Sequence, residues 1–180
     1  VEWDCIRRQE DNSEMIKGMR RFPRDGLLML LVCAAIASTV IAKDTPAAKR
    51  EADKAQFHVY LLIGQSNMAG RAPFTDAEAA VIPRCSLLNK ENKWEPARNP
   101  FNRYSTIRKG LGMQKMNPGY GFAKNMLEKD KTVSIGLVVN AKGGTSIKLW
   151  ATGSKFYKDA VKRTKLAQET GVLKGVLWHQ

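Results

Sequence analysis

Histidine and cysteine are scarce in this sequence. Its 180 residues include two histidines, His58 and His179, and three cysteines. The cysteines are too few and too scattered for a disulfide-stapled miniprotein, and no CxxC pair is present to build a zinc site. Any reaction that needs a histidine base therefore has two candidates in this chain.

Acidic residues are also under-represented. The chain has 17 Asp and Glu residues against 30 Lys and Arg residues, which gives a formal net charge of +13. Residues 1–42 hold six residues of each sign, so the whole excess lies in residues 43–180. Such a domain attracts polyanions, but the sequence has no zinc finger, no aromatic RNP pattern and no dense basic block. We expect a solvated basic surface and no nucleic-acid partner.

Long apolar runs are absent except for one. It covers residues 27–41 and is shorter than the roughly 20 residues that span a bilayer. A basic segment that begins at Met19 precedes the run, and Val40-Ile41-Ala42 fits a signal peptidase site. Residues 19–42 are therefore interpreted as a signal peptide cleaved after Ala42, with cleavage at Ala37 and a retained membrane helix as the alternatives.

The signal peptide determines how the rest of the chain is divided. Residues 1–18 show no apolar periodicity and stay unassigned, and the true start is expected at Met15 or Met19. After cleavage we expect a secreted or periplasmic protein without a stable membrane anchor. Cys85 is then the one cysteine left, so the mature domain can form no internal disulfide.

The remaining residues fit one globular domain in length and apolar content. A polar stretch at 43–56, typical of a linker, comes first. Apolar, β-branched runs then alternate with segments of helical spacing, which indicates parallel βαβ units. We predict an α/β fold, a sandwich built around a parallel sheet. The expected strands are residues 57–63, 85–88, 133–139 and one starting at 176, and the expected helices are 121–129 and 154–169, with Ser154 as N-cap.

Polar motifs follow three of the expected strands. Gly64-Gln65-Ser66-Asn67-Met68 follows the first, residues 140–146 follow the strand at 133–139, and His179-Gln180 follows the last. Sites in such sheets lie at the carboxyl ends of the strands, so we expect the three loops to meet. A serine in a Gly-flanked turn can expose its Oγ, a Gly-Gly pair can present N–H groups to an oxyanion, and a glutamine adds an amide donor. An acyl-transfer site is therefore predicted from Ser66, Gly143, Gly144 and Gln180.

Other glycine-rich motifs fit less well. Met68 occupies the position of the second glycine of the α/β-hydrolase elbow, and neither phosphate-loop pattern is matched. Taken singly, Ser66 fits a turn residue that bonds its own backbone, and Gly143-Gly144 fits a plain turn. The prediction of a site therefore depends on the three loops together.

The three motifs carry a resemblance to a known family. Gly64 to Met68, Gly143-Gly144-Thr145-Ser146-Ile147 and Trp178-His179-Gln180 resemble the signature blocks of the SGNH (GDSL-type) hydrolases, in the branch of carbohydrate esterase family 6 and the sialate O-acetylesterase domain. The resemblance covers roughly residues 57–180. It implies a flavodoxin-like three-layer α/β/α sandwich with a parallel sheet. It also implies a serine esterase that removes O-acetyl groups from an acetylated oligo- or polysaccharide, without metal or organic cofactor.

The resemblance also implies a role for individual residues. Ser66 is the implied nucleophile, and the oxyanion hole takes its donors from the Ser66 N–H, a glycine N–H at Gly143 or Gly144, and Gln180. Gln65 and Asn67 are implied to support the loop. Whether the sugar is xylan, pectin or sialoglycan stays open.

The sequence departs from the family pattern in its catalytic base. The family supplies Asp and His together in a D-x-x-H motif, and this chain has none, so residues 57–180 are interpreted as a partial esterase domain that lacks its C-terminal part. His58 begins the strand whose far end leads to Ser66, about 20 Å away at strand rise. His179 and Gln180 should point to opposite sides of an extended segment. We expect the chain itself to be nearly inert and prone to aggregation, and the alternative is a non-catalytic polysaccharide-binding or degenerate esterase-like module.

Overall fold

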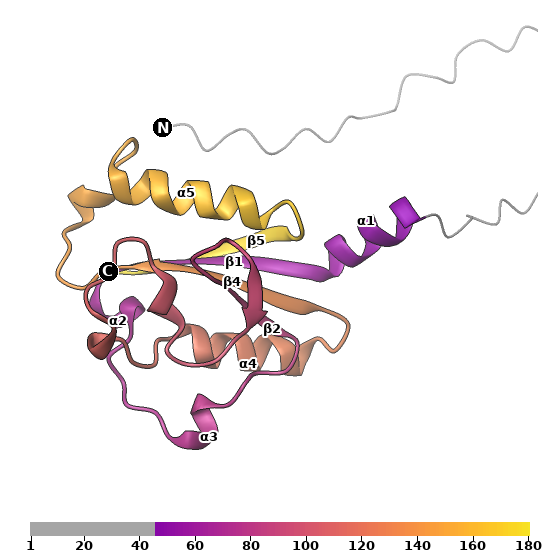
Figure 1. Ribbon diagram of the computed structural model, residues 1–180, viewed down its shortest axis with the longest axis horizontal. Helices are drawn as coiled ribbons and strands as arrows, with labels where there is room; N and C mark the ends of the chain where they lie inside the picture. Colours follow the sequence, from indigo (N-terminus) through magenta and orange to yellow (C-terminus); the bar gives the residue numbers. More distant parts are fainter. Residues whose placement is uncertain (1–45) are drawn as a thin grey trace, which may run out of the picture. The chain divides into compact units, whose positions relative to one another are not determined.

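The computed structural model describes residues 46–180, which contain a mixed α/β fold. The signal peptide, the upstream segment and the two possible starts lie outside the described residues. A five-stranded sheet has the strand order β3-β2-β4-β1-β5, with helices on both of its faces (Figure 1). The predicted α/β sandwich is confirmed.

Three long parallel strands lie side by side in the order β4-β1-β5, with β5 at the edge of the described sheet. They are β1 (Phe57–Gly64), β4 (Ser134–Ala141) and β5 (Val172–His179). Apolar, β-branched runs make strands that can be buried on both faces, and β1 and β4 pair in register from Phe57 and Ser134 to Gly64 and Ala141. Strands β4 and β5 lie on either side of β1, so strands that follow β1 in the chain are added on both of its sides, as at the switch point of a doubly wound sheet.

The other two strands form a hairpin at one edge. Strand β2 (Cys85–Leu88) pairs parallel with β4, and β3 (Trp94–Pro96) pairs antiparallel with β2. The sheet is therefore mostly parallel. Cys85 is a buried free thiol, and burial raises its pKa to about 12, so it is not a thiolate nucleophile at neutral pH.

Two helices cover the faces of the sheet. Helix α4 (Gly119–Lys129) buries Ala123 and Leu127 against one face, and α5 (Lys155–Ala167) buries Ala160 and Ala167 against the other. In Figure 1 the two helices lie on opposite sides of the strands. The N-cap of α5 is Ser154, as predicted, and its side chain accepts a hydrogen bond from the Tyr157 N–H. These two helices complete the three layers.

The expected linker contains a helix. Residues Pro46–Gln56 form α1, and none of them is buried. The sequence does not predict this helix because the segment has no apolar face. Its alanine, lysine and glutamate residues nevertheless favour helix formation. The shorter elements are α2 (Ser66–Ala69), α3 (Asp76–Ala79) and the 3₁₀ turns η1 (Phe101–Tyr104), η2 (Leu111–Met113) and η3 (Ile147–Trp150).

Two strand boundaries differ from the prediction. Strand β4 runs through Asn140 and Ala141, which the sequence placed in the following loop, and β5 begins at Val172 rather than at residue 176. Backbone pairing with β1 extends both strands over residues whose side chains alone do not indicate a strand. Within residues 46–180, no helix has the length and apolar character needed to span a bilayer.

Candidate functional site

Ser66 lies directly beyond the carboxyl end of β1, where the chain turns sharply. Gly64 has φ +138°, and a Cβ at this position would lie 2.0 Å from the His179 carbonyl oxygen. Gln65 donates its backbone N–H to that same oxygen over 2.9 Å. The turn therefore requires a glycine, and it ties the end of β1 to the end of β5.

The serine contacts its neighbour and the loop after β4. Both the backbone N–H and the Oγ of Ser66 donate to Oε1 of Gln65, each over 2.9 Å. Gly143 lies so close that a Cβ there would be 3.4 Å from the Ser66 Cα. Asn67 is exposed, and its backbone carbonyl accepts a hydrogen bond from the Gly70 N–H. The N–H expected to serve an oxyanion thus already donates to a side-chain oxygen.

The loop after β4 presents unused backbone donors. Among the described residues, the N–H groups of Gly143 and Gly144 have no hydrogen-bond partner. Gly144 has φ +72°, which favours glycine, and the Lys142 N–H donates to the Gly64 carbonyl over 3.1 Å. Gln180 donates its Nε2 to the Thr145 carbonyl over 2.6 Å. The structure therefore brings the loops after β1, β4 and β5 together.

Neither histidine contacts Ser66 Oγ. His58 lies at the amino end of β1, paired with Ile135, and burial lowers its pKa. The exposed His179 lines a hollow of about 500 Å³ together with Asn67 and Arg71. Within residues 46–180, no histidine or carboxylate hydrogen-bonds the Ser66 hydroxyl. The described residues also contain no group of three His, Cys, Asp or Glu side chains placed to hold a metal.

Arg71 is a charged neighbour of the site that the sequence did not single out. Its Nη1 donates to the carbonyls of Gly70 and Met113, and its Nη2 lies 2.4 Å from where a Cβ of Gly143 would be. An antiparallel bridge between Ala72 and Met116 holds this segment in place. The signal that could have indicated Arg71 is its position in the sequence, immediately after Gly70 at the end of the serine motif.

Buried asparagines support the loops and were also missed. Asn102 is fully buried, and its side chain accepts from the Ala141 N–H over 2.9 Å and donates to the Ala141 carbonyl over 3.0 Å. Asn117 donates to the Met68 carbonyl over 2.9 Å, which holds the short helix that begins at Ser66. Each partner lies tens of residues away in sequence, so no local pattern could indicate either contact.

The geometry can stabilise a developing negative charge beside a serine hydroxyl. Gly143, whose N–H is unpaired, lies next to Ser66 and the Arg71 guanidinium, and the Gln180 amide is bonded to Thr145 of the same loop; such donors stabilise the oxyanion of acyl transfer. Serine needs a base to become a strong nucleophile, and the described residues bring none into contact with it. The described residues thus supply hydrogen-bond donors suited to acyl transfer, but they place no base beside the serine.

Comparison with known proteins adds a family to this geometry. Residues 56–180 match the family described as carbohydrate esterase, sialic acid-specific acetylesterase. A probable carbohydrate esterase of Arabidopsis thaliana is 39% identical over 140 residues, covering 68% of this chain and 52% of that protein. The chain thus spans about half the length of this curated relative.

Solved structures show the same fold. The 1.6 Å crystal structure of the Arabidopsis protein matches with a TM-score of 0.60 and 33% identity, over 67% of this chain and 56% of that one. The crystal structure of NanS matches with a TM-score of 0.53 and 19% identity, over 70% of this chain and 54% of that one. The second likeness concerns the fold alone.

Proposed function

Since the chain belongs to the sialic acid-specific acetylesterase family of carbohydrate esterases, we propose that Ser66 attacks O-acetyl esters of a carbohydrate. The observation that carries this proposal is the contact between the Ser66 turn and the Gly143-Gly144 loop, whose N–H groups have no other partner among the described residues. A serine beside unused backbone donors is what acyl transfer through an oxyanion requires.

The proposed oxyanion hole uses donors from three strands. Oε1 of Gln65 now accepts from the Ser66 N–H, and a substrate carbonyl oxygen would take its place. Gly143 or Gly144 supplies the second N–H. The amide of Gln180 has two N–H groups, and the bond to Thr145 uses one of them and orients the other. Arg71 adds positive potential beside the same position.

The proposed reaction has two steps. A base takes the proton from Ser66 Oγ while Oγ bonds to the acetyl carbon, and the carbonyl oxygen becomes the oxyanion. Its collapse breaks the bond to the sugar oxygen, which leaves with a proton from the base. Water, deprotonated by that base, then attacks the acetyl-serine, and acetate leaves as the serine hydroxyl is restored.

The proposal assigns the base to residues of the whole protein other than those described. His58 lies at the opposite end of β1, and His179 makes no hydrogen bond to Ser66. The chain alone is therefore proposed to hydrolyse esters slowly, because a serine hydroxyl without a base is a weak nucleophile. Its acetylated substrate is proposed to lie outside the cell, in keeping with the signal peptide expected at residues 19–42.

A second function has its own observation in favour. The hydroxyl of Ser66 donates to an amide oxygen rather than to a base, as expected for a module that binds polysaccharide without hydrolysing it. The two functions differ in whether Ser66 reacts when a base is supplied. They can therefore be separated in this chain.

Added imidazole supplies the missing base. We expect imidazole to accelerate release of acetate from 4-nitrophenyl acetate by this chain well beyond the rate in free solution, and the Ser66→Ala variant to show only the solution rate. Ser134→Ala, at the amino end of β4, is the matched control and should behave like the parent. Equal imidazole-dependent rates for the parent and Ser66→Ala would favour the binding module.

A further inference from the structure

A second cavity lies beside the Ser66 site and is strongly basic. It has a volume of about 650 Å³, within the range of small-molecule ligand pockets, and neither Ser66 nor the Gly143-Gly144 loop lines it. Its walls come from the turn after β2, the segment around η1 and one side of α5. The cationic side chains in its lining are Lys90, Arg103, Arg108, Lys155, Lys162 and Arg163.

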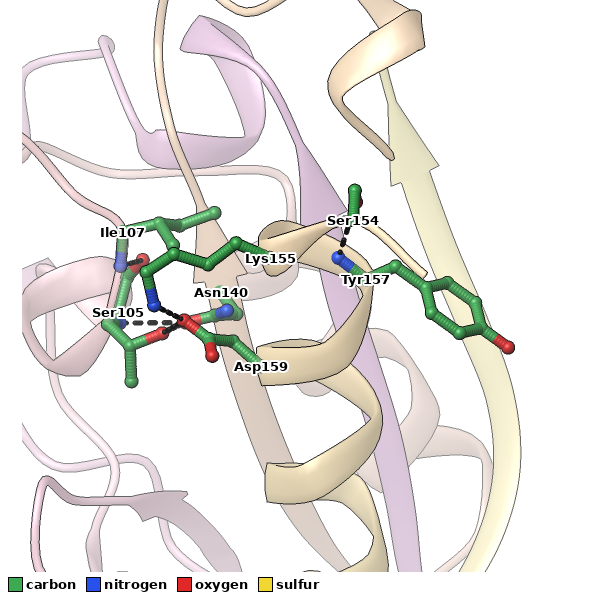
Figure 2. A network of polar contacts seen from close by, with 8 residues as sticks. Ser105, Ile107, Asn140, Ser154, Lys155, Tyr157 and Asp159 are labelled. Atoms are coloured by element: carbon green, nitrogen blue, oxygen red, sulfur yellow. Dashed lines mark hydrogen bonds and ion pairs between the residues drawn. The ribbon is translucent and has the colours of Figure 1, made fainter. Parts of the chain in front are cut away.

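Asp159 is the one carboxylate in the lining and is already paired, and Glu91, outside the lining, lies 3.5 Å from the Lys90 Nζ. Asp159 accepts a hydrogen bond from Lys155 Nζ over 2.7 Å and from Thr106 Oγ1 over 3.0 Å. Figure 2 shows Lys155 and Asp159 together on α5, while Tyr157 points away from them. Lys162 forms no hydrogen bond or ion pair with the described residues. Arg103, Arg108, Lys162 and Arg163 form no ion pair with the described residues, so the cavity keeps an excess of positive charge.

Arg163 places a desolvated cation in the cavity wall. Its side chain is 4% exposed, and its terminal nitrogens donate to the carbonyls of Tyr104, Leu88 and Asn89. Its Nε is buried without a partner, and within residues 46–180 no carboxylate forms an ion pair with it. Burial lowers the pKa of Arg163 to about 10, so the group is charged at neutral pH. A buried, unpaired guanidinium favours an anionic ligand.

The cavity and the Ser66 site share one segment of chain. Ser105 lines the cavity and donates its hydroxyl to the Ala141 carbonyl, two residues before the Gly143-Gly144 loop. Lys109, adjacent to the cavity residue Arg108, has its Nζ 3.5 Å from where a Cβ of Gly144 would be. Residues 105–109 therefore join the wall of the cavity to the loop beside Ser66.

We propose that the cavity binds the carboxylates of an acidic polysaccharide, a chain of uronate units, whose acetyl ester reaches Ser66. The claim that the acetyl ester reaches Ser66 rests on the proposed function. Several cations spread over the cavity match carboxylates repeated along a chain better than one terminal acid group. Tyr104 is the one aromatic side chain in its lining, whereas single-stranded nucleic acid is bound on stacking aromatic platforms.

Binding is measured on the full chain carrying Ser66→Ala, so that no turnover is needed. The probes are an unesterified oligogalacturonate, a neutral xylo-oligosaccharide of equal length, sialyllactose with its single carboxylate, and a single-stranded RNA of equal charge, each titrated by calorimetry at low and high salt. We expect the oligogalacturonate to bind more tightly than the other three, and to weaken as salt screens the cations.

Exposed lysines provide the variants because Arg163 is buried and supports the fold. Lys162→Gln and Lys155→Gln should each weaken oligogalacturonate binding by about two- to fivefold, the size of one partly exposed ion pair, and the double variant by about tenfold. Lys131→Gln removes an exposed cation from the loop before β4 and should change nothing. Thermal unfolding of each variant checks that the fold is intact.

Three results would overturn the proposal. Undiminished oligogalacturonate binding by the double variant would exclude the cavity as the site. Tighter lysine-dependent binding of the RNA would make it a nucleic-acid surface, and tighter binding of sialyllactose would limit it to a single acid group. Failure of the proposed esterase is seen separately, in the imidazole experiment, because these titrations need no reaction at Ser66.

Discussion

Strands β4 and β5 both pair with β1, yet they differ in burial. From Ile135 to Ala141 every residue of β4 is buried, whereas no residue of β5 is, and Val176 and Trp178 are 51% and 41% exposed. Strand β4 has β2 on its other side, and among the described residues β5 has no second partner strand. Similar apolar runs therefore become core or edge according to their neighbours.

The two strands also support different parts of the candidate site. The Gly143-Gly144 loop extends from the buried strand and is held by Asn102 through Ala141. Gln180 extends from the half-exposed strand and depends on its bond to the Thr145 carbonyl. We infer that the backbone donors of the proposed oxyanion hole are preorganised by the core, and that its proposed side-chain donor, Gln180, is held less firmly.

The largest effect on stability is expected in the centre of β4. Leu137 is fully buried, so Leu137→Ala should lower the free energy of unfolding by about 2–5 kcal/mol through lost burial and the cavity left behind. Urea unfolding followed by circular dichroism measures the change. Leu149→Ala, at a residue 48% exposed, is the matched control. A Leu137→Ala cost no larger than that of the control would contradict the buried position of β4.

A smaller effect is expected where the buried strand meets the site. Asn102→Ala leaves the buried N–H of Ala141 without its side-chain partner and its carbonyl with the Ser105 hydroxyl alone, which should cost about 1–3 kcal/mol. It should also lower imidazole-supported hydrolysis, because the Gly143-Gly144 loop loses its support. Asn125→Ala removes one exposed hydrogen bond on α4 and should stay within about 0.5 kcal/mol of the parent. An Asn102→Ala variant that matches Asn125→Ala would disprove the supporting role.

The smallest effect is expected on the outer strand. Val176→Thr keeps the β-branched shape at a half-exposed position, so the free energy of unfolding should change by less than about 0.5 kcal/mol. The same urea unfolding series measures it. A loss of about 2 kcal/mol would contradict this, because a threonine hydroxyl is that costly only when it is buried without a hydrogen bond. Such a loss would show that another element covers β5.

Local patterns predicted the fold well where one segment determines its own structure. The apolar runs of β1, β2 and β4 and the Ser154 cap of α5 indicated these elements before any tertiary contact was known. Strand β3 was not predicted because it has only three residues and ends in a proline. A proline is tolerated there because β3 lies at the edge of the sheet. Helix α1 was not predicted because none of its residues is buried, so its sequence has no apolar periodicity.

The site was predictable in its loops but not in its supports. Ser66, Gly143 and Gln180 each follow a strand, and parallel strands bring their carboxyl ends to one edge. The position of Arg71 depends on the bridge between Ala72 and Met116, and that of Asn102 on Ala141, 39 residues away. Such contacts follow from the packed fold rather than from sequence spacing.

Capture of the acyl-serine tests the central claim most directly. The whole protein is mixed with 4-nitrophenyl acetate, quenched in acid during the first turnovers and digested, and the peptides are sequenced by mass spectrometry. We predict one acetyl group on Ser66 in the parent and none in the Ser66→Ala variant. An acetyl group on His179 instead, or acetate release by Ser66→Ala at the parent rate, would contradict the assignment of Ser66 as the nucleophile.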